Sequence, residues 1–515
     1  MLRDLRGATR RGDRADRQVR RTGARGEIVS GKVASGGSVR SAVIGIEIHV
    51  QLRTATKMFC PCAIPTDADE PNSRTCPTCL GLPGALPTPN RAAIEKVIAV
   101  GAAIGAKTPS TTRWDRKNYF YPDLPKGYQI SQLDLPLAEH GSIEVTTSAG
   151  VGSVRIRRAH LEEDTARLRH ERAGDGSRAS LIDYNRSGVA LLEIVTEPDL
   201  RDAETSRRYA EELRLLLRTI GAADAEMENG QMRVEANVSL RDSEEAPFGT
   251  RVEVKNMNSF RSVERAIAFE IARQNELLDA GGSVTQETRG WDDTSETTYT
   301  MRAKEDSHDY RYFPEPDLPP LAISDAWIAE IRARLPELPA ARRARYVADL
   351  GLTAYDAGVL VGEPRAASLF EAARAAQPAL DAKLLANWVA GEYLRAANEG
   401  AGEPEPKQFA ALVAAVGAGE INGATGKALF AELCAGPLDI RAVITERGLA
   451  QISDDGALEA IAAETLAASP QALADWRAGK QQALGFLVGQ AMKASKGRGN
   501  PARLGEIMRR LLDAQ

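Results

Sequence analysis

The stretch Val43-Ile-Gly-Ile-Glu-Ile-His-Val-Gln-Leu52 alternates apolar and polar side chains. In a β-strand, successive side chains point to opposite faces of the sheet. The apolar face would carry Ile44, Ile46, Ile48, Val50 and Leu52. The polar face would carry Glu47, His49 and Gln51. The period of two predicts a strand with one face in a core and one face of unusual chemistry.

Similar alternation predicts further strands at residues 153–156, 232–240 and 251–255, and helical patterns lie at 91–104 and 204–220. Loops containing Pro and Gly connect them. This mixture, up to about residue 321, predicts an α+β domain built on a largely antiparallel sheet. After the Pro-rich segment 314–320 the strands vanish, and the pattern is helical to the end.

Length and composition predict a multidomain globular chain. The chain has 515 residues, of which 43% are apolar and 27% charged, with a net charge of −5. That length predicts two or three domains. No apolar run is long enough to cross a membrane. The negative net charge argues against a protein that binds nucleic acid over its whole surface.

The parts of the chain differ in amino-acid composition and in the pattern of their apolar residues. The first 40 residues hold eleven Lys or Arg against four acids, and we expect a basic, disordered extension. This start lacks the apolar stretch of a signal peptide, so a cytoplasmic protein is expected. The predicted parts are 1–40, a mixed domain at 41–325 with an insertion at 58–82, a helical domain at 326–440 and a helical tail at 441–515.

Four of the five cysteines lie close together, as Cys60-Pro-Cys62 and Cys76-Pro-Thr-Cys79. Two close pairs of thiolates can surround one tetrahedral zinc ion. Both pairs lie in turn-forming sequence, and no ligand position is left open, so we expect a structural zinc site. An iron–sulfur cluster is the main alternative, and four unrelated buried cysteines are a third possibility.

Acidic, amide and histidine side chains recur on the polar faces of the predicted strands. The candidates are Glu47, His49, Glu162, Glu163, Asn185, Glu193, Glu235 and Lys255. Such groups suit magnesium and the phosphates of ATP. For any single acid, a solvated strand face explains the pattern equally well. No familiar phosphate-binding loop is present, and spacing alone does not establish a nucleotide site.

Basic residues gather near the end of the chain, where Lys480, Lys493, Lys496 and Arg498 precede or flank Gly497, in a turn between two helices. A basic turn of this kind can bind the phosphates of RNA. A solvated helix end is the alternative interpretation of the same residues.

Several longer strings resemble one family, the B subunits of bacterial aspartyl/glutamyl-tRNA(Asn/Gln) amidotransferases (the GatB/GatE family). They are 43–52 (VIGIEIHVQL), 116–132 (RKNYFYPDLPKGYQISQ), 160–164 (HLEED), 183–186 (DYNR), 193–199 (EIVTEPD), 255–260 (KNMNSF), 286–289 (QETR) and 308–317 (HDYRYFPEPD). The resemblance covers about residues 41–515. One mild departure is Glu235, where an Asp is common in the family.

The resemblance implies a cradle-shaped catalytic domain, a helical domain and a YqeY-like tail that binds tRNA. It implies ATP-dependent amidation of Glu-tRNA(Gln) or Asp-tRNA(Asn) through an acyl phosphate. The implied partners are an amidase (the A subunit) that supplies ammonia, a small C subunit that completes a heterotrimer, the mischarged tRNA and a non-discriminating aminoacyl-tRNA synthetase. Whether Glu-tRNA(Gln), Asp-tRNA(Asn) or both is the physiological substrate is left open.

On this resemblance, we expect Glu47, His49 and Glu163 to bind magnesium. Further site candidates are Glu162, Asn185, Glu193 and Glu235, with Lys255 as the cation for phosphate charge. The rival hypothesis is a non-catalytic, zinc-containing RNA-binding or assembly protein. That protein would need the cysteines and the basic tail, but not ordered carboxylate faces.

Overall fold

The computed structural model describes residues 40–172, 176–303, 309–452, 454–495 and 497–513. The predicted basic extension, apart from Arg40, lies outside these residues. Among the described residues, no helix is both long and apolar enough to cross a bilayer.

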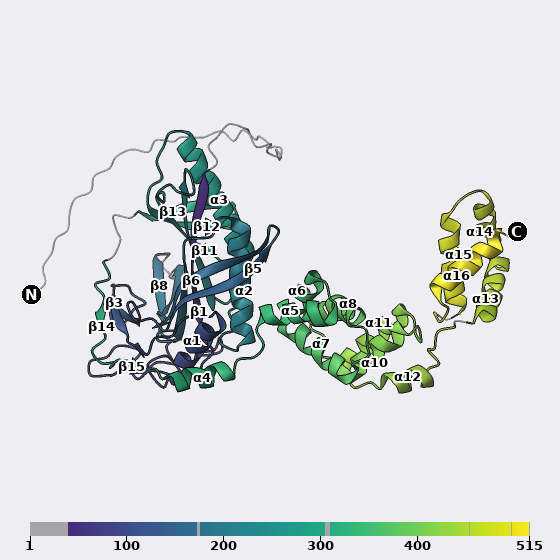
Figure 1. The fold of residues 1–515 in the computed structure, drawn as a ribbon, viewed down its shortest axis with the longest axis horizontal. Coiled ribbons are helices and arrows are strands. Elements are labelled where there is room, and N and C mark those ends of the chain that lie inside the picture. The colour runs from purple at the N-terminus through teal and green to yellow at the C-terminus, as the bar shows by residue number, and fades with distance from the viewer. Residues whose placement is uncertain (1–39, 173–175, 304–308, 453, 496, 514–515) are drawn as a thin grey trace, which may run out of the picture. The chain divides into compact units, whose positions relative to one another are not determined.

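Eight strands form the main sheet in the order β13-β12-β11-β10-β1-β9-β6-β5 (Figure 1). All neighbours are antiparallel except β11 and β12, which are parallel. The bounds are β1 (Ser41–Gln51), β5 (Ala138–Thr147), β6 (Gly150–Glu163), β9 (Ala190–Thr196), β10 (Met232–Arg241), β11 (Val252–Met257), β12 (Glu287–Asp292) and β13 (Thr297–Ala303). The predicted α+β class with a largely antiparallel sheet is confirmed.

The alternation in β1 decides which face of the sheet is covered. Ile44, Ile46 and Ile48 are at most 1% exposed and lie in one core. The same core takes side chains from α1 (Arg91–Ala103), α2 (Ala203–Thr219) and α3 (Phe260–Asp279). Each fully buried aliphatic side chain contributes roughly 1.5–3 kcal/mol. The three helices therefore cover the apolar face, and the face carrying Glu47 and His49 is left for other contacts.

Seven further strands among the described residues lie outside the main sheet. β3 (Asp115–Asn118) pairs with β4 (Tyr128–Ser131) and with β14 (Phe313–Pro314). β7 (Arg167–Arg172) and β8 (Arg178–Asp183) form a separate hairpin, and β2 (Thr111–Thr112) pairs with β15 (Leu321–Ala322). β4 lies against the end of β6, where Gln129 Nε2 donates a hydrogen bond of 2.7 Å to the Glu163 carbonyl oxygen.

The rest of the described chain is helical, as predicted. α4 (Asp325–Ala333) belongs to the first core through Ile331. A second core gathers α5 (Pro339–Leu350), α6 (Ala354–Gly362), α7 (Pro364–Ala376), α8 (Ala382–Trp388), a π-helical turn (Val389–Tyr393), α9 (Leu394–Asn398), α10 (Pro406–Gly417), α11 (Gly423–Ala435) and α12 (Ile440–Glu446). A third gathers α13 (Asp455–Ala467), α14 (Pro470–Arg477), α15 (Gln482–Ala494) and α16 (Pro501–Asp513).

Two details differ from the predicted boundaries. Ile440, Val443 and Ile444 of α12 pack in the second core, so a cut at 440/441 falls inside that core. The first core likewise continues past residue 325 into α4.

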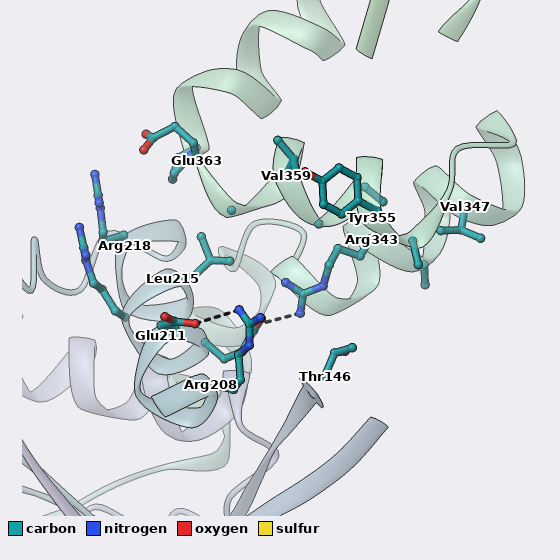
Figure 2. Close-up of a pocket in the computed structure, with 18 of the residues that line it drawn as sticks. Thr146, Arg208, Glu211, Leu215, Arg218, Arg343, Val347, Tyr355, Val359 and Glu363 are labelled. Atoms are coloured by element: carbon teal, nitrogen blue, oxygen red, sulfur yellow. Dashed lines mark hydrogen bonds and ion pairs between the residues drawn. The ribbon is translucent and has the colours of Figure 1, made fainter. Parts of the chain in front are cut away.

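The outward side of α2 is polar: Arg208 Nη1 lies 3.1 Å from Glu211 Oε2, and both line the pocket drawn in Figure 2.

Candidate active site on the polar face of the sheet

Strand register brings polar side chains from β1, β9 and β6 together. His49 of β1 lies opposite Glu193 of β9, and Glu193 lies opposite His160 of β6. On the other side of β1, Glu47 lies opposite Glu235 of β10. Directly opposite residues share a face of the sheet. The predicted residues Glu47, His49, Glu193 and Glu235 are therefore neighbours on one face.

Three carboxylates converge on one imidazole. His49 Nε2 lies 3.3 Å from Glu193 Oε2 and 3.7 Å from both Glu47 Oε1 and Glu162 Oε1. His160 Nε2 lies 3.3 Å from Glu193 Oε2 and 3.8 Å from Glu162 Oε2. We call Glu47, His49, His160, Glu162 and Glu193 the carboxylate–histidine cluster.

The proximity of like charges and burial shift the pKa values within the cluster. Burial raises the pKa of Glu47 to about 7, and the charge of Glu193 adds to this shift. Burial alone would lower the pKa of His49, but its hydrogen bond to Glu193 and the neighbouring carboxylates raise it to about 9. Burial opposes ionisation of Glu193, yet the two imidazoles hold its pKa well below the ordinary value. Such opposed shifts are typical of functional sites.

Lys117 of β3 provides a cation to the cluster. Burial would lower its pKa, but the charges of Glu162 and Glu193 raise it. Its Nζ also lies 5.2 Å from the ring centroid of Tyr310. Neither Lys117 nor His160 is among the site residues predicted from the sequence. The alternation of His160 with Glu162 is a signal that could have identified His160. The position of Lys117 beside the cluster depends on how β3 packs, and the sequence pattern does not predict it.

Lys255 and Glu235, both predicted site residues, pair with each other beside the cluster. Lys255 Nζ lies 2.7 Å from Glu235 Oε2 and 3.4 Å from Glu253 Oε1. Burial opposes both charges, but their mutual attraction lowers the pKa of Glu235 and raises that of Lys255. The pair adds a further cation to this face of the sheet, where Arg158 Nη2 also lies 3.8 Å from Glu193 Oε1.

Glu163 and Asn185 lie apart from the cluster. Glu163 Oε1 pairs with Lys126 and accepts a hydrogen bond of 2.9 Å from the Ile130 amide. The side-chain amide of Asn185 forms hydrogen bonds with the backbone of Arg74 and Glu70, in the segment that carries the cysteines. Two groups on this face have ligand atoms within 4.8 Å of one another. They are Glu47, His49 and Glu193, and His160, Glu162 and Glu193. Glu163 and Asn185 belong to neither group. The predicted role of Glu163 in magnesium binding stays a prediction that this placement does not favour.

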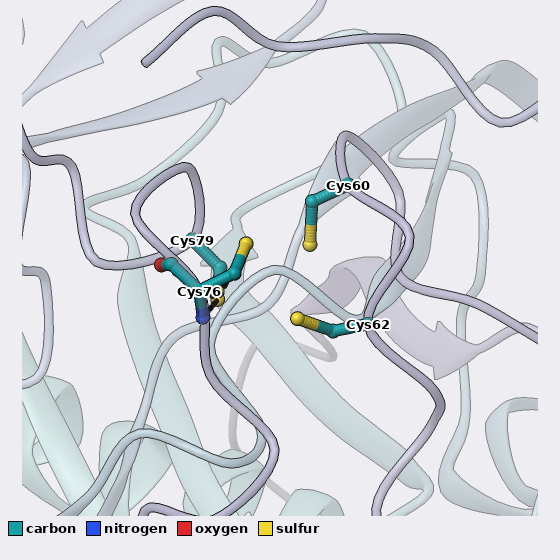
Figure 3. A group of neighbouring side chains, drawn as sticks. All are labelled: Cys60, Cys62, Cys76 and Cys79. Carbon is teal, nitrogen blue, oxygen red and sulfur yellow. Dashed lines mark hydrogen bonds between the residues drawn. The ribbon is translucent and has the colours of Figure 1, made fainter. Parts of the chain in front are cut away.

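The four clustered cysteines face one another (Figure 3). Their sulfur atoms lie within 4.8 Å of one another, as a tetrahedral metal site requires. Lys57 beside them is fully buried, with Nζ 3.6 Å from Cys79 Sγ and 2.8 Å from the Arg74 carbonyl oxygen. A hydrogen bond from Cys60 lowers the pKa of Cys79 to about 4, and the Lys57 charge acts in the same direction. Buried ammonium beside a thiolate fits a negatively charged metal–thiolate centre.

The predicted RNA-binding turn is described in part. Lys493 is exposed on α15, whereas Arg498 is half-buried and donates a 3.3 Å hydrogen bond to the Gly448 carbonyl oxygen. Gly497 has φ +76, which supports a tight turn between α15 and α16. Lys496 lies outside the described residues.

Comparison with known proteins covers nearly the whole described chain. Residues 42–329 match the family described as the GatB/GatE catalytic domain, and residues 368–512 match the GatB domain. The B subunit of an aspartyl/glutamyl-tRNA(Asn/Gln) amidotransferase from Carboxydothermus hydrogenoformans is 46% identical over 473 residues, which cover 91% of this chain and 98% of the relative. The B subunit of Moorella thermoacetica is also 46% identical, over 92% of this chain and 99% of its own length. That of Anaeromyxobacter sp. is 47% identical over 91% and 98%.

Proposed function

This chain belongs to the GatB/GatE family, and from that premise we propose that it amidates Glu on tRNA(Gln), Asp on tRNA(Asn), or both. The observation that carries the proposal is the carboxylate–histidine cluster, which lies on the one face of the sheet that α1, α2 and α3 do not cover. On a solvated strand face, the carboxylates would point into water; here Glu162 and Glu193 are buried beside the imidazole of His49, and Glu47 is half-buried there.

The proposed reaction has two steps. A carboxylate oxygen of the tRNA-bound Glu or Asp attacks the γ-phosphorus of ATP. The bond between the γ-phosphorus and ADP breaks, ADP leaves, and an acyl phosphate is formed. Ammonia then attacks the carbonyl carbon, the C–O bond to phosphate breaks, and a proton leaves the nitrogen as the amide forms. Both steps move negative charge onto phosphate oxygens. Among the cations on this face, Lys117 and Lys255 are our candidates for stabilising that charge; Arg158 Nη2 also lies 3.8 Å from Glu193 Oε1.

The cluster fits a magnesium ion as well as the reacting phosphates. Glu47, Glu162 and Glu193 each place a carboxylate oxygen within 4 Å of His49 Nε2, so oxygen ligands of the kind that magnesium prefers are gathered at one point. We propose Glu47, His49 and Glu193 as the residues that would hold magnesium, with Glu162 and Glu235 lining the site. Bound magnesium would neutralise charge on the phosphates of ATP.

The partners follow from the same premise. We propose that the chain works in the cytoplasm in a heterotrimer with an amidase, the A subunit, which releases ammonia from glutamine, and with a small C subunit. The relatives are named as B subunits, which supports a complex of several chains. The set of aminoacyl-tRNA synthetases in the cell would decide which mischarged tRNA is the physiological substrate.

The test is an assay of the assembled complex with Glu-tRNA(Gln) and Asp-tRNA(Asn) in parallel. We expect glutamine- and ATP-dependent amidation of at least one tRNA, and ATP hydrolysis that requires magnesium and charged tRNA. The rival, a non-catalytic zinc-containing RNA-binding protein, would bind tRNA but hydrolyse no ATP. Binding without hydrolysis in the presence of an active amidase partner would refute the proposed function.

A further inference from the structure

A buried asparagine joins the cysteine segment to the sheet. We name residues 58–82 the cysteine loop and residues 183–188 the β8–β9 turn. Asn185 of the turn is 3% exposed. Its Oδ1 accepts a 2.7 Å hydrogen bond from the Arg74 amide, and its Nδ2 donates a 2.8 Å bond to the Glu70 carbonyl oxygen. Both polar atoms of the side chain are thus engaged by the cysteine loop.

Reciprocal contacts strengthen this junction. The Tyr184 amide donates a 2.7 Å hydrogen bond to Asn72 Oδ1, and the Asn72 amide donates a 3.0 Å bond to Asp183 Oδ1. Ser187 Oγ donates a 3.2 Å bond to the carbonyl oxygen of Cys79 itself. The turn is therefore attached to the loop both at a metal-ligand residue and in the segment between the two cysteine pairs.

The other end of the turn holds the end of β6. The Gly188 amide donates a 2.9 Å hydrogen bond to the Asp164 carbonyl oxygen, and the Asp164 amide donates a 2.8 Å bond to the Val189 carbonyl oxygen. Gly188 has φ +86, and a Cβ there would lie 3.4 Å from Cys79 Cβ and 3.9 Å from Glu163 Oε2. A cysteine of the loop and a carboxylate of β6 thus pack against the same glycine.

A second contact reaches Glu163 from the end of the cysteine loop. Gly81 has φ +67, and a Cβ there would lie 3.2 Å from Lys126 Cα and closer still to Lys126 Cγ. The Lys126 ammonium in turn pairs with Glu163 Oε1. The loop therefore supports Glu163 through Lys126 as well as through the β8–β9 turn.

We infer that the cysteine loop, with its metal bound, is a positioning element for the active site, acting through Asn185 and the β8–β9 turn on residues 162–164. Glu162 belongs to the carboxylate–histidine cluster, and Asp164 pairs with Arg233 at 3.2 Å. Most residues between the two cysteine pairs are exposed, so the loop lacks a core of its own. A metal bound by the four thiolates would add to the order that its hydrogen bonds to the β8–β9 turn give it. The inference rests on the proposed function.

Asn185 is in this view a positioning residue and not a catalytic one. Displacement of residues 162–164 would misplace a carboxylate of the cluster while leaving the surfaces available to the tRNA body intact. The expected kinetic signature is a fall in kcat with little change in KM for charged tRNA.

The first test measures amide hydrogen exchange in the full-length chain with its partner subunits, before and after removal of zinc by a chelator. We expect exchange to rise about tenfold or more at Asp164, Gly188 and Ile130, as loss of one or two supporting hydrogen bonds would produce. Exchange in the second helical core should not change. Unchanged exchange at Asp164 and Gly188 after zinc removal would overturn the inference.

The second test uses Asn185→Ala, with Asn422→Ala as the matched control because Asn422 is a buried N-cap asparagine of α11. Asn185→Ala should retain its zinc, raise exchange at Asp164 and lower kcat about tenfold. Asn422→Ala, which removes a hydrogen bond from Nδ2 to the Gly497 carbonyl oxygen in the tail, should leave the zinc content and the exchange at Asp164 unchanged. Normal kcat and exchange in zinc-loaded Asn185→Ala would show that the loop does not act through this residue. A wild-type complex that amidates neither tRNA would refute the proposed function, whereas the exchange measurement would still test the junction.

Discussion

His49 Nε2 lies 3.3 Å from Glu193 Oε2, on the neighbouring strand. The same carboxylate oxygen lies 3.3 Å from His160 Nε2. One buried carboxylate thus interacts with two imidazoles, and its charge raises the pKa of both His49 and His160. The charge of the cluster, and with it the stability of the sheet domain, should depend on pH.

The first prediction concerns that dependence in the metal-free chain. Because the pKa of His49 is about 9 in the folded chain and near 6.5 when unfolded, its proton stabilises the fold fully below pH 6.5. This stabilisation is lost as the pH rises through 9, and amounts to about 3 kcal/mol. Calorimetry should show the unfolding temperature of the sheet domain falling from pH 6.5 to 9.5. His49→Gln should show a smaller fall; an equal fall would contradict the prediction.

The second prediction concerns chemistry at the cluster. Glu47→Ala and His49→Ala should each lower amidation by at least about 100-fold, because each removes a group from the charge-stabilising site. Binding of tRNA and glutamine hydrolysis by the partner should persist. Glu144→Ala, which removes an exposed acid of β5, is the matched control and should be neutral. Unchanged tRNA-dependent ATP hydrolysis in both cluster variants would mean that this face is structural.

The third prediction concerns the cysteines. Elemental analysis should find about one zinc per chain, bound through Cys60, Cys62, Cys76 and Cys79. Cys62→Ser should lose the metal, whereas Cys434→Ser, which changes the remaining cysteine, should keep it. An iron chromophore, or no metal in protein prepared without chelator, would refute a zinc site.

Sequence alone could predict the sheet and much of the site, because period two assigns faces within a strand. The alternation in β1 placed Glu47 and His49 opposite the core, and the structure has them there. Pairing between strands was not accessible in this way. Glu162 and Glu163 are adjacent, so period two allows only one of them on the face of His160, and the register of β6 with β9 shows that this face carries the cluster and that Glu162 joins it.

Asn185 and the domain boundary show which features the period of a sequence pattern does not determine. Asn185 lies in a turn, where no period assigns a face, and its partners are backbone atoms of a loop distant in sequence. The predicted boundary at 440/441 lies between two stretches that are both helical in pattern. The apolar pattern of α12 is the same whether the helix packs against the domain before it or the tail after it. In the structure it packs in the second core, which precedes it in the chain.

That packing determines how the last prediction must be tested. A deletion from residue 441 would remove Val443 and Ile444 from the second core and destabilise it. Ile452 contacts the third core instead, so deletion from residue 452 onward removes the tail and spares the second core. The truncated chain should therefore fold, and a loss of function can be assigned to the tail.

Truncation from residue 452 should weaken tRNA binding and raise the KM for charged tRNA, because phosphate contacts position an RNA without reading its sequence. Amidation at saturating tRNA should survive better. In the full-length chain, Lys493→Ala with Arg498→Ala should lower the log–log salt slope of tRNA affinity by about two, roughly one per lost phosphate contact. Lys480→Ala is the matched control, since Lys480 Nζ already pairs with Asp475 at 2.9 Å. Equal affinity and salt slope in the double variant would make the turn a solvated helix end, because a cation that contacts no phosphate releases no counterion.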